Sequence, residues 1–186
     1  MKYPLLFSIA LSVLVSPSAH SEETTPFSGK PAVIPGLIEA EHWDKGAPGV
    51  AYYDVDEENR GENYREETQV DIEKRSDASN GHGVGWTKEG EWLIYTVEVK
   101  ESGTYEISIP VASKKKGGNF RIEFDGKDVT GAISIPDTTS WQKLETISQK
   151  GVKLEKGTFK MKVVLYENGE SNSIADIDYF KFVKTK

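Results

Sequence analysis

Two of the four tryptophans follow loop-like sequence instead of lying inside a strand-like pattern. Trp86 comes after the glycine-rich stretch "SNGHGVG", and Trp141 comes after "PDTTS". An indole ring can cover the apolar C–H face of a sugar ring while nearby carboxylates or amides hydrogen-bond the hydroxyl groups on its rim. The alternative is that each indole closes the end of a hydrophobic core. Trp92 lies inside the run "EWLIYTVEV", and we predict that it packs within the domain.

Two pairs of carboxylates stand at strand-like spacing. Glu39 and Glu41 are separated by one residue, and so are Asp176 and Asp178. In a β-strand such residues point to the same face, so each pair concentrates negative charge. Calcium is a hard cation that binds carboxylate and carbonyl oxygens. Two solvated strand faces explain the same spacing, and the residues alone leave both interpretations open.

Motifs that are specific for catalysis are missing from the sequence. It contains no HExxH, GxSxG or Walker A pattern, and His42 and His82 are isolated. A glycosidase needs only two carboxylates, but no acidic residue is marked as lying in an apolar cleft that would raise its pKa. The sequence therefore predicts no catalytic residue.

The composition limits the partners and the location of the protein. The 186 residues carry a formal net charge of −7 and no cysteine. This acidic balance argues against nucleic-acid binding, which depends on neutralising phosphates. Residues 1–21 combine one lysine, an apolar run from Pro4 to Val15 and small residues at Ala19 and Ser21, which is the pattern of a secretory signal peptide. We therefore expect a secreted or periplasmic protein that does not associate with a membrane.

Strand patterns dominate the rest of the chain. Residues 22–36 hold several prolines and glycines and are predicted to be a linker, followed by one domain over residues 37–186. Hydrophobic and polar residues alternate in "GTYEISIPVAS", "NFRIEFDGK" and "FKMKVVLYENG", as in antiparallel strands with one buried face. Pro110 suggests an edge strand or a bulge. Since no helical period is sustained, the pattern predicts an all-β fold, an antiparallel β-sandwich.

Several longer segments are similar to those of one known family. They occur in the family's order and read "IEAEHWD", "GVAYYDVDEENRGENYR", "VDIE", "GVGWTKEGEWLIYTVEV", "GTYEISIPVAS", "GGNFRIEFDG", "IPDTTSWQ" and "IDYFKF". From about Ile34 to Val183 the chain thus resembles a family 6 carbohydrate-binding module. The resemblance implies a jelly-roll sandwich, a structural calcium ion, a glycan site in the loops at one edge, and no catalysis.

The resemblance also implies ligands for the calcium ion. Glu39 and Glu41 of the "EAE" motif and Asp178, before the last aromatic run, would bind it through their carboxylates. Backbone carbonyls would complete the shell, and one of them is expected around Arg65.

For the glycan cleft, the resemblance implies that Trp86 and Trp141 face each other and that Glu73 of "VDIE" is the polar contact. Many members of the family have an asparagine two residues before the calcium-binding aspartate. This sequence has Asp176 there, with Asn172 nearby. The departure leaves the hydrogen-bonding partner of the sugar open and bears on sugar preference.

The function implied by the resemblance is non-catalytic binding of a plant or algal polysaccharide or oligosaccharide. Xylan, β-glucan and agarose or a related galactan are all possible ligands. The module would target an attached or partner glycoside hydrolase to its substrate, and a covalently linked catalytic domain is one possibility. The alternatives are a small exported polysaccharide lyase or glycosidase and an adhesive surface domain that needs no sugar.

Overall fold

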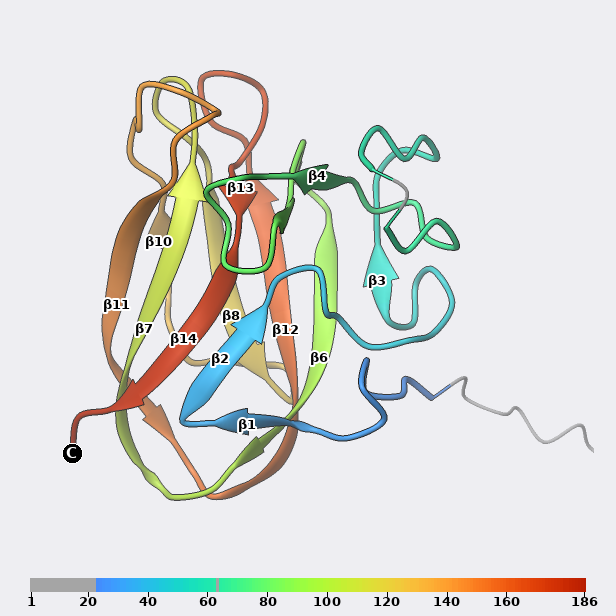
Figure 1. Ribbon diagram of the computed structural model, residues 1–186. Helices are drawn as coiled ribbons and strands as arrows, with labels where there is room; N and C mark the ends of the chain where they lie inside the picture. The colour runs from blue at the N-terminus through green and yellow to red at the C-terminus, as the bar shows by residue number, and fades with distance from the viewer. Residues whose placement is uncertain (1–22, 63) are drawn as a thin grey trace, which may run out of the picture.

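The computed structural model describes residues 23–62 and 64–186 (Figure 1). The predicted signal peptide lies outside these residues. The described chain forms fourteen strands and no α-helix, and accordingly none of its residues belongs to a helix long and apolar enough to cross a membrane.

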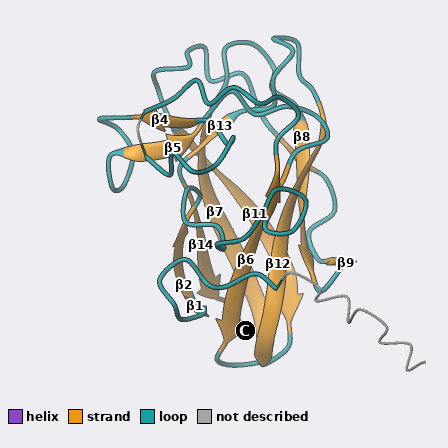
Figure 2. Ribbon diagram, turned by 90° about the vertical axis from the view of Figure 1, so that its right-hand side faces the viewer, coloured by secondary structure: helices purple, strands orange, loops and turns teal. Residues whose placement is uncertain are grey.

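The strands build two sheets that pack face to face (Figures 1 and 2). The first sheet has the order β1-β6-β12-β8-β10, with β3 beside β6 and β9 beside β8. Its strands are β1 (Ala32–Ile34), β3 (Tyr52–Tyr53), β6 (Trp92–Val99), β8 (Asn119–Phe124), β9 (Lys127–Asp128), β10 (Ile133–Ser134) and β12 (Gly157–Glu167).

The second sheet has the order β2-β14-β7-β13-β5-β4, with β11 on the other edge of β7. Its strands are β2 (Gly36–Glu39), β4 (Ile72–Lys74), β5 (His82–Val84), β7 (Gly103–Ala112), β11 (Glu145–Leu154), β13 (Asp176–Ile177) and β14 (Tyr179–Lys184). The predicted all-β sandwich is therefore confirmed. Figure 2 shows that the longer loops gather at one end of it.

The three alternating segments of the sequence form β7, β8 and β12. Their hydrophobic residues face the space between the sheets and are buried, whereas most of the alternate positions remain partly accessible. This agreement follows from the period of a strand, which sends successive side chains to opposite faces. The largest buried side chains of the core are Trp43, Tyr52, Tyr95, Tyr105, Phe120, Phe180 and Phe182.

The sandwich begins before residue 37, inside the predicted linker. Ala32–Ile34 form β1, which pairs in parallel with β6, and Ile34 is fully buried in the core. This is a parallel pair in an otherwise antiparallel architecture. The prolines and glycines of residues 22–36 indicate a linker, and a strand of three residues is too short to show a period that would reveal it.

Pro110 lies in the central strand β7, not at an edge or a bulge as its type suggests. It pairs with Thr146 on one side, and its carbonyl accepts a hydrogen bond from the Asp178 amide on the other. Proline has no N–H to complete the ladder, and the neighbouring strand is interrupted at this point, between β13 and β14. Pro110 therefore coincides with the break at which Asp178 lies.

Trp92 does not belong to the core, contrary to the prediction that it packs inside the domain. It is half-buried on the outer face of the first sheet, where its ring stacks 6.5 Å from Tyr53 and lies 4.0 Å from Lys162 Nζ. The core tryptophan is Trp43, which is fully buried. Alternation along a strand shows which residues share a face, but it does not show which face is covered.

Candidate functional site

A cleft of about 400 Å³ opens among the loops that follow β5, β10 and β12. It is lined by all five residues assigned to a glycan cleft from the sequence: Glu73, Trp86, Trp141, Asn172 and Asp176. Loops that are far apart along the chain thus bring the two tryptophans to one hollow.

Four further residues line the cleft, namely Lys88, Gln142, Ser171 and Ser173. Sequence reasoning did not select them. Gln142 carries a usable signal, because it stands directly beside Trp141 in the "WQ" motif. The other three lie in loops, where no period marks the direction of a side chain.

Trp86 adopts a backbone conformation that is unusual for a bulky residue. Its φ is 49°, in the left-handed region, and its side chain is 40% exposed. Gly85 before it is buried against the floor of the cleft, and a Cβ added there would lie 3.3 Å from Asp176 Oδ1. A strained, exposed tryptophan persists only where its surroundings fix it, and such strain is typical of functional positions.

Trp141 is carried by a loop that is tied to the end of β7. The buried Thr138 hydroxyl accepts a hydrogen bond from the Ser113 amide at 2.9 Å, and Asp137 Oδ1 accepts one from the Lys115 amide at 2.9 Å. The Trp141 carbonyl accepts a hydrogen bond from Arg75 Nη1 at 2.9 Å. The loop therefore has a defined path up to the indole.

The floor of the cleft contains two carboxylates on one buried cation. Arg75 Nη1 lies 2.7 Å from Glu73 Oε2 and 3.0 Å from Asp176 Oδ2. Burial first, and then repulsion from Glu73, raise the pKa of Asp176, while the ion pair with Arg75 opposes the shift. Glu73 Oε1 faces Gln142 Nε2 at 3.4 Å. The floor thus offers fixed acceptors and one amide group.

Asn172 lies at the exposed tip of the loop between β12 and β13, with a φ of 55°. Close backbone contacts hold the base of this loop. The Glu170 amide donates to the Lys116 carbonyl at 2.9 Å, and a Cβ on Gly169 would lie 2.3 Å from the carbonyl carbon of Gly117. Only glycine permits this approach, so the loop presents Asn172 from a firm base.

The carboxylates predicted to bind calcium converge on Ser79 and Asn80. Ser79 Oγ lies 2.6 Å from Glu39 Oε2 and 3.1 Å from Asp178 Oδ1, and Asn80 Nδ2 donates to Glu41 Oε1. Three carboxylates, from the end of β2, from the turn that follows it and from the β13–β14 break, therefore surround one short loop. Among the described residues, however, no three acidic or histidine side chains are close enough to form a ready-made metal cluster.

The chemistry of this group nevertheless suits a hard cation. Glu41 is fully buried, and its Oε2 has no hydrogen-bond partner. Burial, together with the charges of Glu39 and Asp178, raises the pKa of Glu41 to about 7. A buried carboxylate oxygen without a partner is costly, and a calcium ion would supply the missing positive charge.

The structure gives Arg65 a role through its side chain. Its guanidinium donates to the carbonyls of Trp43 at 2.6 Å and of Glu41 at 3.3 Å and lies 3.9 Å from the Trp43 ring. Its own carbonyl, which was expected near the metal, accepts hydrogen bonds from the amide and the hydroxyl of Thr68. Arg65 thus braces the backbone that carries Glu41.

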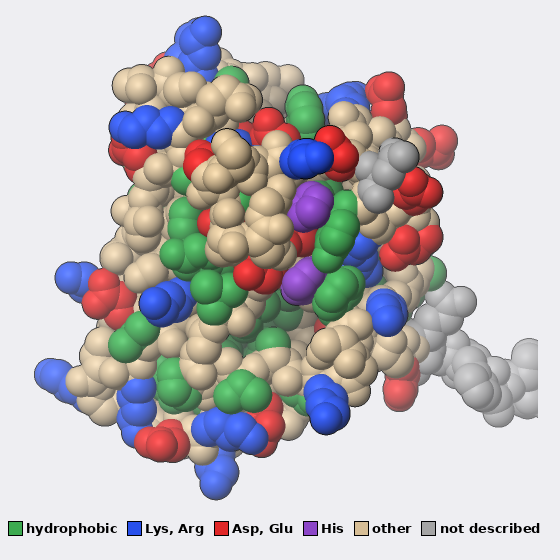
Figure 3. Space-filling model, in the orientation of Figure 1, with side chains coloured by type: hydrophobic (Ala, Val, Ile, Leu, Met, Phe, Trp, Pro, Cys, Tyr) green, Lys and Arg blue, Asp and Glu red, His purple; other side chains and the backbone are tan. Residues whose placement is uncertain are grey.

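The two histidines of the domain belong to an aromatic row on one face (Figure 3). His42 stacks on Phe27 with ring centroids 4.0 Å apart, and His82 stacks on Tyr64 at 4.5 Å. His42 Nε2 also lies 2.9 Å from the Tyr64 hydroxyl. Both rings are thus engaged in packing. The two histidines are isolated in the sequence, but they are not isolated in the structure.

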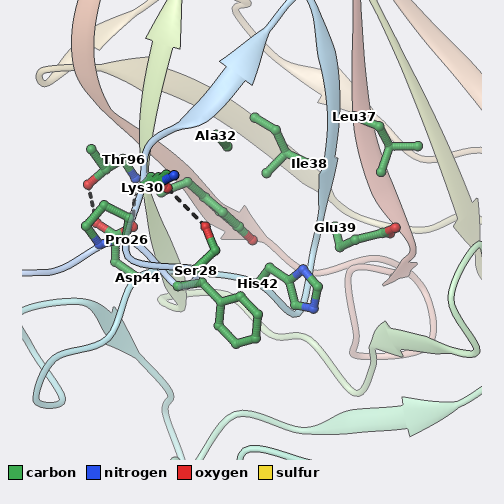
Figure 4. A pocket seen from close by; sticks show the side chains of 12 residues that line it. Pro26, Ser28, Lys30, Ala32, Leu37, Ile38, Glu39, His42, Asp44 and Thr96 are labelled. Atoms are coloured by element: carbon green, nitrogen blue, oxygen red, sulfur yellow. Dashed lines mark hydrogen bonds between the residues drawn. The ribbon is translucent and has the colours of Figure 1, made fainter.

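A smaller hollow of about 180 Å³ lies beneath the segment that precedes β1 (Figure 4). Ser28, Leu37, Glu39 and His42 are among its lining residues. It contains neither of the two loop tryptophans, and it adjoins the Glu39 side of the carboxylate group. The larger cleft between the loops is therefore the candidate binding site.

A sandwich of two sheets, with two tryptophans and a polar floor lining a cleft between its loops, is the arrangement expected of a carbohydrate-binding module. The sequence model "Carbohydrate binding module (family 6)" matches residues 60–184, and the chain belongs to this family. Members of the family bind carbohydrate without catalysis, and this chain is a binding module and not an enzyme.

Individual relatives share the sequence or the fold. The Clotting factor G alpha subunit of Tachypleus tridentatus is 34% identical over 104 residues, which are 55% of this chain and 15% of that protein. The chain therefore spans a small part of this curated relative.

Two solved modules match most of this chain and 98% of their own lengths. The module of Cellvibrio mixtus lichenase 5A, in complex with cellotriose, has a TM-score of 0.59 at 25% identity over 82% of this chain. The C-terminal module of the Zobellia galactanivorans laminarinase LamC has a TM-score of 0.55 at 28% identity over 80%.

Proposed function

We propose that the cleft between Trp86 and Trp141 binds a plant or algal polysaccharide, with β-glucan as the first candidate. The observation that carries the proposal is the convergence of two loop tryptophans, one of them strained and exposed, on one polar-floored cleft. If each indole buries roughly 100 Å² of apolar sugar surface, it contributes about 2–3 kcal/mol before the costs of binding. Modest affinity for a chain of several sugars follows.

The preference for β-glucan rests on the relatives. One solved module holds cellotriose, and the other belongs to a laminarinase. Both modules come from glycan-degrading enzymes, which supports a role in holding a linked or partner glycoside hydrolase on its substrate. Xylan and agarose or related galactans remain the competing ligands.

Affinity electrophoresis through native gels tests this proposal. Gels would contain a β-1,3-glucan, a mixed-linkage β-glucan, xylan or agarose, and bovine serum albumin would serve as the non-binding reference. We expect retardation in β-glucan, and its loss in Trp86→Ala. Retardation only in xylan or agarose would overturn the ligand preference, and migration unaffected by every glycan would overturn the function.

We also propose that Glu39, Glu41 and Asp178 hold a structural calcium ion. The partnerless Glu41 Oε2 and the mutual repulsion of the three carboxylates support it. The cation would contribute charge neutralisation, whereas Ser79 and Asn80 position the carboxylates.

Export is a further proposal and rests on the sequence of residues 1–21. We propose that the mature module is secreted or periplasmic. Amino-terminal sequencing of protein collected outside the cytoplasm should give Glu22 as the first residue. A chain that still begins at Met1 would contradict it.

A further inference from the structure

Arg75 is a buried cation at the centre of the cleft floor. It follows β4 directly, and its side chain is 2% exposed. The Nε and Nη2 atoms bind the two oxygens of Asp77 at 3.0 and 3.1 Å. The Nη1 atom faces three other acceptors within 3.0 Å: Glu73 Oε2, Asp176 Oδ2 and the Trp141 carbonyl.

These contacts join parts of the chain that are remote in sequence. Asp176 lies 101 residues after Arg75, and Trp141 lies 66 residues after it. A second contact reinforces the tie to the Trp141 loop, because Asp77 Oδ2 also accepts a hydrogen bond from the Leu144 amide at 2.9 Å. The guanidinium therefore fixes the Trp141 loop relative to β4 and β13.

Asp176 extends the same network to the other tryptophan. Its Oδ1 lies against Gly85, the residue that directly precedes Trp86. Trp86, Asp176, Arg75 and Trp141 are thus connected in series. The connection reaches the Trp141 carbonyl on one side and the glycine beside Trp86 on the other.

We propose that Arg75 is a positioning residue for carbohydrate binding, which sets the separation of Trp86 and Trp141 through Asp176 and the Trp141 carbonyl. The inference rests on the proposed function of the cleft and goes beyond it. Binding to a preformed aromatic pair avoids the cost of ordering two loops at the moment of association. Since Asp176 is buried and paired with Arg75, the direct hydrogen bonds to sugar hydroxyls fall to the more accessible Glu73, Gln142 and Asn172.

The geometry requires arginine and not simply a positive charge. Arginine presents five donors in a planar fork, whereas lysine is a compact point charge on a flexible stem. A lysine at position 75 would retain an ion pair with one or two of the three carboxylates. It would not reach Asp77, Asp176 and the Trp141 carbonyl together.

The decisive variant is Arg75→Lys. We expect it to keep most of the melting temperature and to lose at least about tenfold in affinity, the factor that corresponds to ~1.4 kcal/mol. Titrations would use cellohexaose and a β-1,3-glucan hexasaccharide. Affinity equal to that of the wild type would overturn the proposal.

Nuclear magnetic resonance provides a readout that needs no glycan. The four tryptophans give four indole N–H signals, whose heteronuclear NOE reports picosecond-to-nanosecond mobility. In Arg75→Lys we expect lower NOE values for Trp86 and Trp141 only. If both indoles stay as rigid as in the wild type, Arg75 does not position them.

Asp44→Asn is the matched control for loss of a buried charge. Asp44 is buried and paired with Lys160 at 3.1 Å, beside Trp43 and outside the cleft. We expect this variant to lose stability while affinity and the NOE values of Trp86 and Trp141 stay unchanged. A general loss of affinity in both variants would show that binding follows global stability, and the proposal would be wrong.

If Arg75→Lys does not fold, the wild type decides the question. The Nε–H of Arg75 should exchange slowly with solvent in the free protein and keep its chemical shift when glycan saturates the cleft. Rapid exchange, or a shift caused by direct contact with the sugar, would overturn a preformed positioning role. If no glycan binds the wild type, the proposed function fails, while the NOE and exchange measurements still test the network.

Discussion

A tryptophan at positive φ is a poor choice for packing, and the conformation of Trp86 therefore supports the ligand site proposed for the cleft. Its φ of 49° strains the backbone, yet 40% of its side chain stays exposed. We expect Trp86→Gly and Trp86→Ala to abolish retardation by glycan with melting temperatures within a few degrees of the wild type. Glycine should be the more stable of the two because it accepts positive φ without strain.

Trp141→Ala should behave like Trp86→Ala, and Trp43 supplies the contrast. Trp43 is fully buried, so its replacement by alanine should cost about 3–5 kcal/mol of unfolding free energy. Trp92→Ala should fall between these cases, since Trp92 is half-buried on a sheet surface. Thermal melting and affinity gels on all four variants would check the ranking. If Trp86→Ala unfolds the domain, Trp86 belongs to the core, and its assignment to the glycan cleft is wrong.

The raised pKa of Glu91 predicts how the free energy of unfolding depends on pH. Burial, and then the charge of Asp54, raise the pKa of Glu91 from 4.5 to about 8 in the folded protein. Between these values the folded state holds a proton that the unfolded state has lost, so stability should fall as pH rises through this window. Glu91→Gln should flatten the decline, whose size is on the order of a few kcal/mol.

Melting curves from pH 4.5 to 8.5 would measure this effect. Glu155→Gln is the control, because Glu155 is exposed at the other end of the sandwich. The same slope in Glu91→Gln and in the wild type would show that Glu91 is not the titrating group.

At the scale of elements, β1 decides where the domain starts. Ile34 is fully buried, and β1 pairs with β6 over three residues. We expect a chain of residues 36–186 to melt well below a chain of residues 22–186, because it loses this pairing and about 1.5–3 kcal/mol from the burial of one isoleucine. Equal melting temperatures of the two chains would show that residues 22–36 are a linker that does not stabilise the domain.

Substitutions within β1 separate packing from strand pairing. Ile34→Ala removes the buried side chain, while Val33→Ala changes a side chain that is 44% exposed. Only the first should lower the melting temperature, by the amount typical of a large-to-small core substitution.

At the scale of the whole molecule, the calcium proposal links β2 to the break between β13 and β14. Binding to the native state alone stabilises it by mass action. We expect a chelator to lower the melting temperature of the wild type, and elemental analysis to find calcium. An unchanged melting temperature together with no detectable metal would refute the site.

Glu41→Gln sharpens this test. With calcium present the variant should be less stable than the wild type, since it lacks one carboxylate ligand. With chelator present the difference in stability between the variant and the wild type should vanish or change sign, because glutamine removes a buried carboxyl whose pKa is raised to about 7. Glu106→Gln, on the surface of β7, should respond to chelator like the wild type.

The sequence by itself determined the all-β class, the faces of β7, β8 and β12, and the residues that share the cleft. Alternation shows the direction in which successive side chains of a strand point. The family motifs identify residues of one site that no regular spacing in the sequence connects. The family motifs place Trp86 and Trp141 in one cleft, although the two residues are 55 positions apart and the sequence does not show the strand order.

Only the tertiary structure decided which tryptophans were covered and which charges met. Trp43 is fully buried, with its ring 6.0 Å from Tyr52 and 3.9 Å from the Arg65 guanidinium, whereas Trp92 is half-buried on a sheet surface. Glu73 and Asp77 flank Arg75 in the sequence, but its other partners, Trp141 and Asp176, approach it only where β4 and β13 join the same sheet. Ion pairs depend on distance in space, and the sequence specifies that distance only through the completed fold.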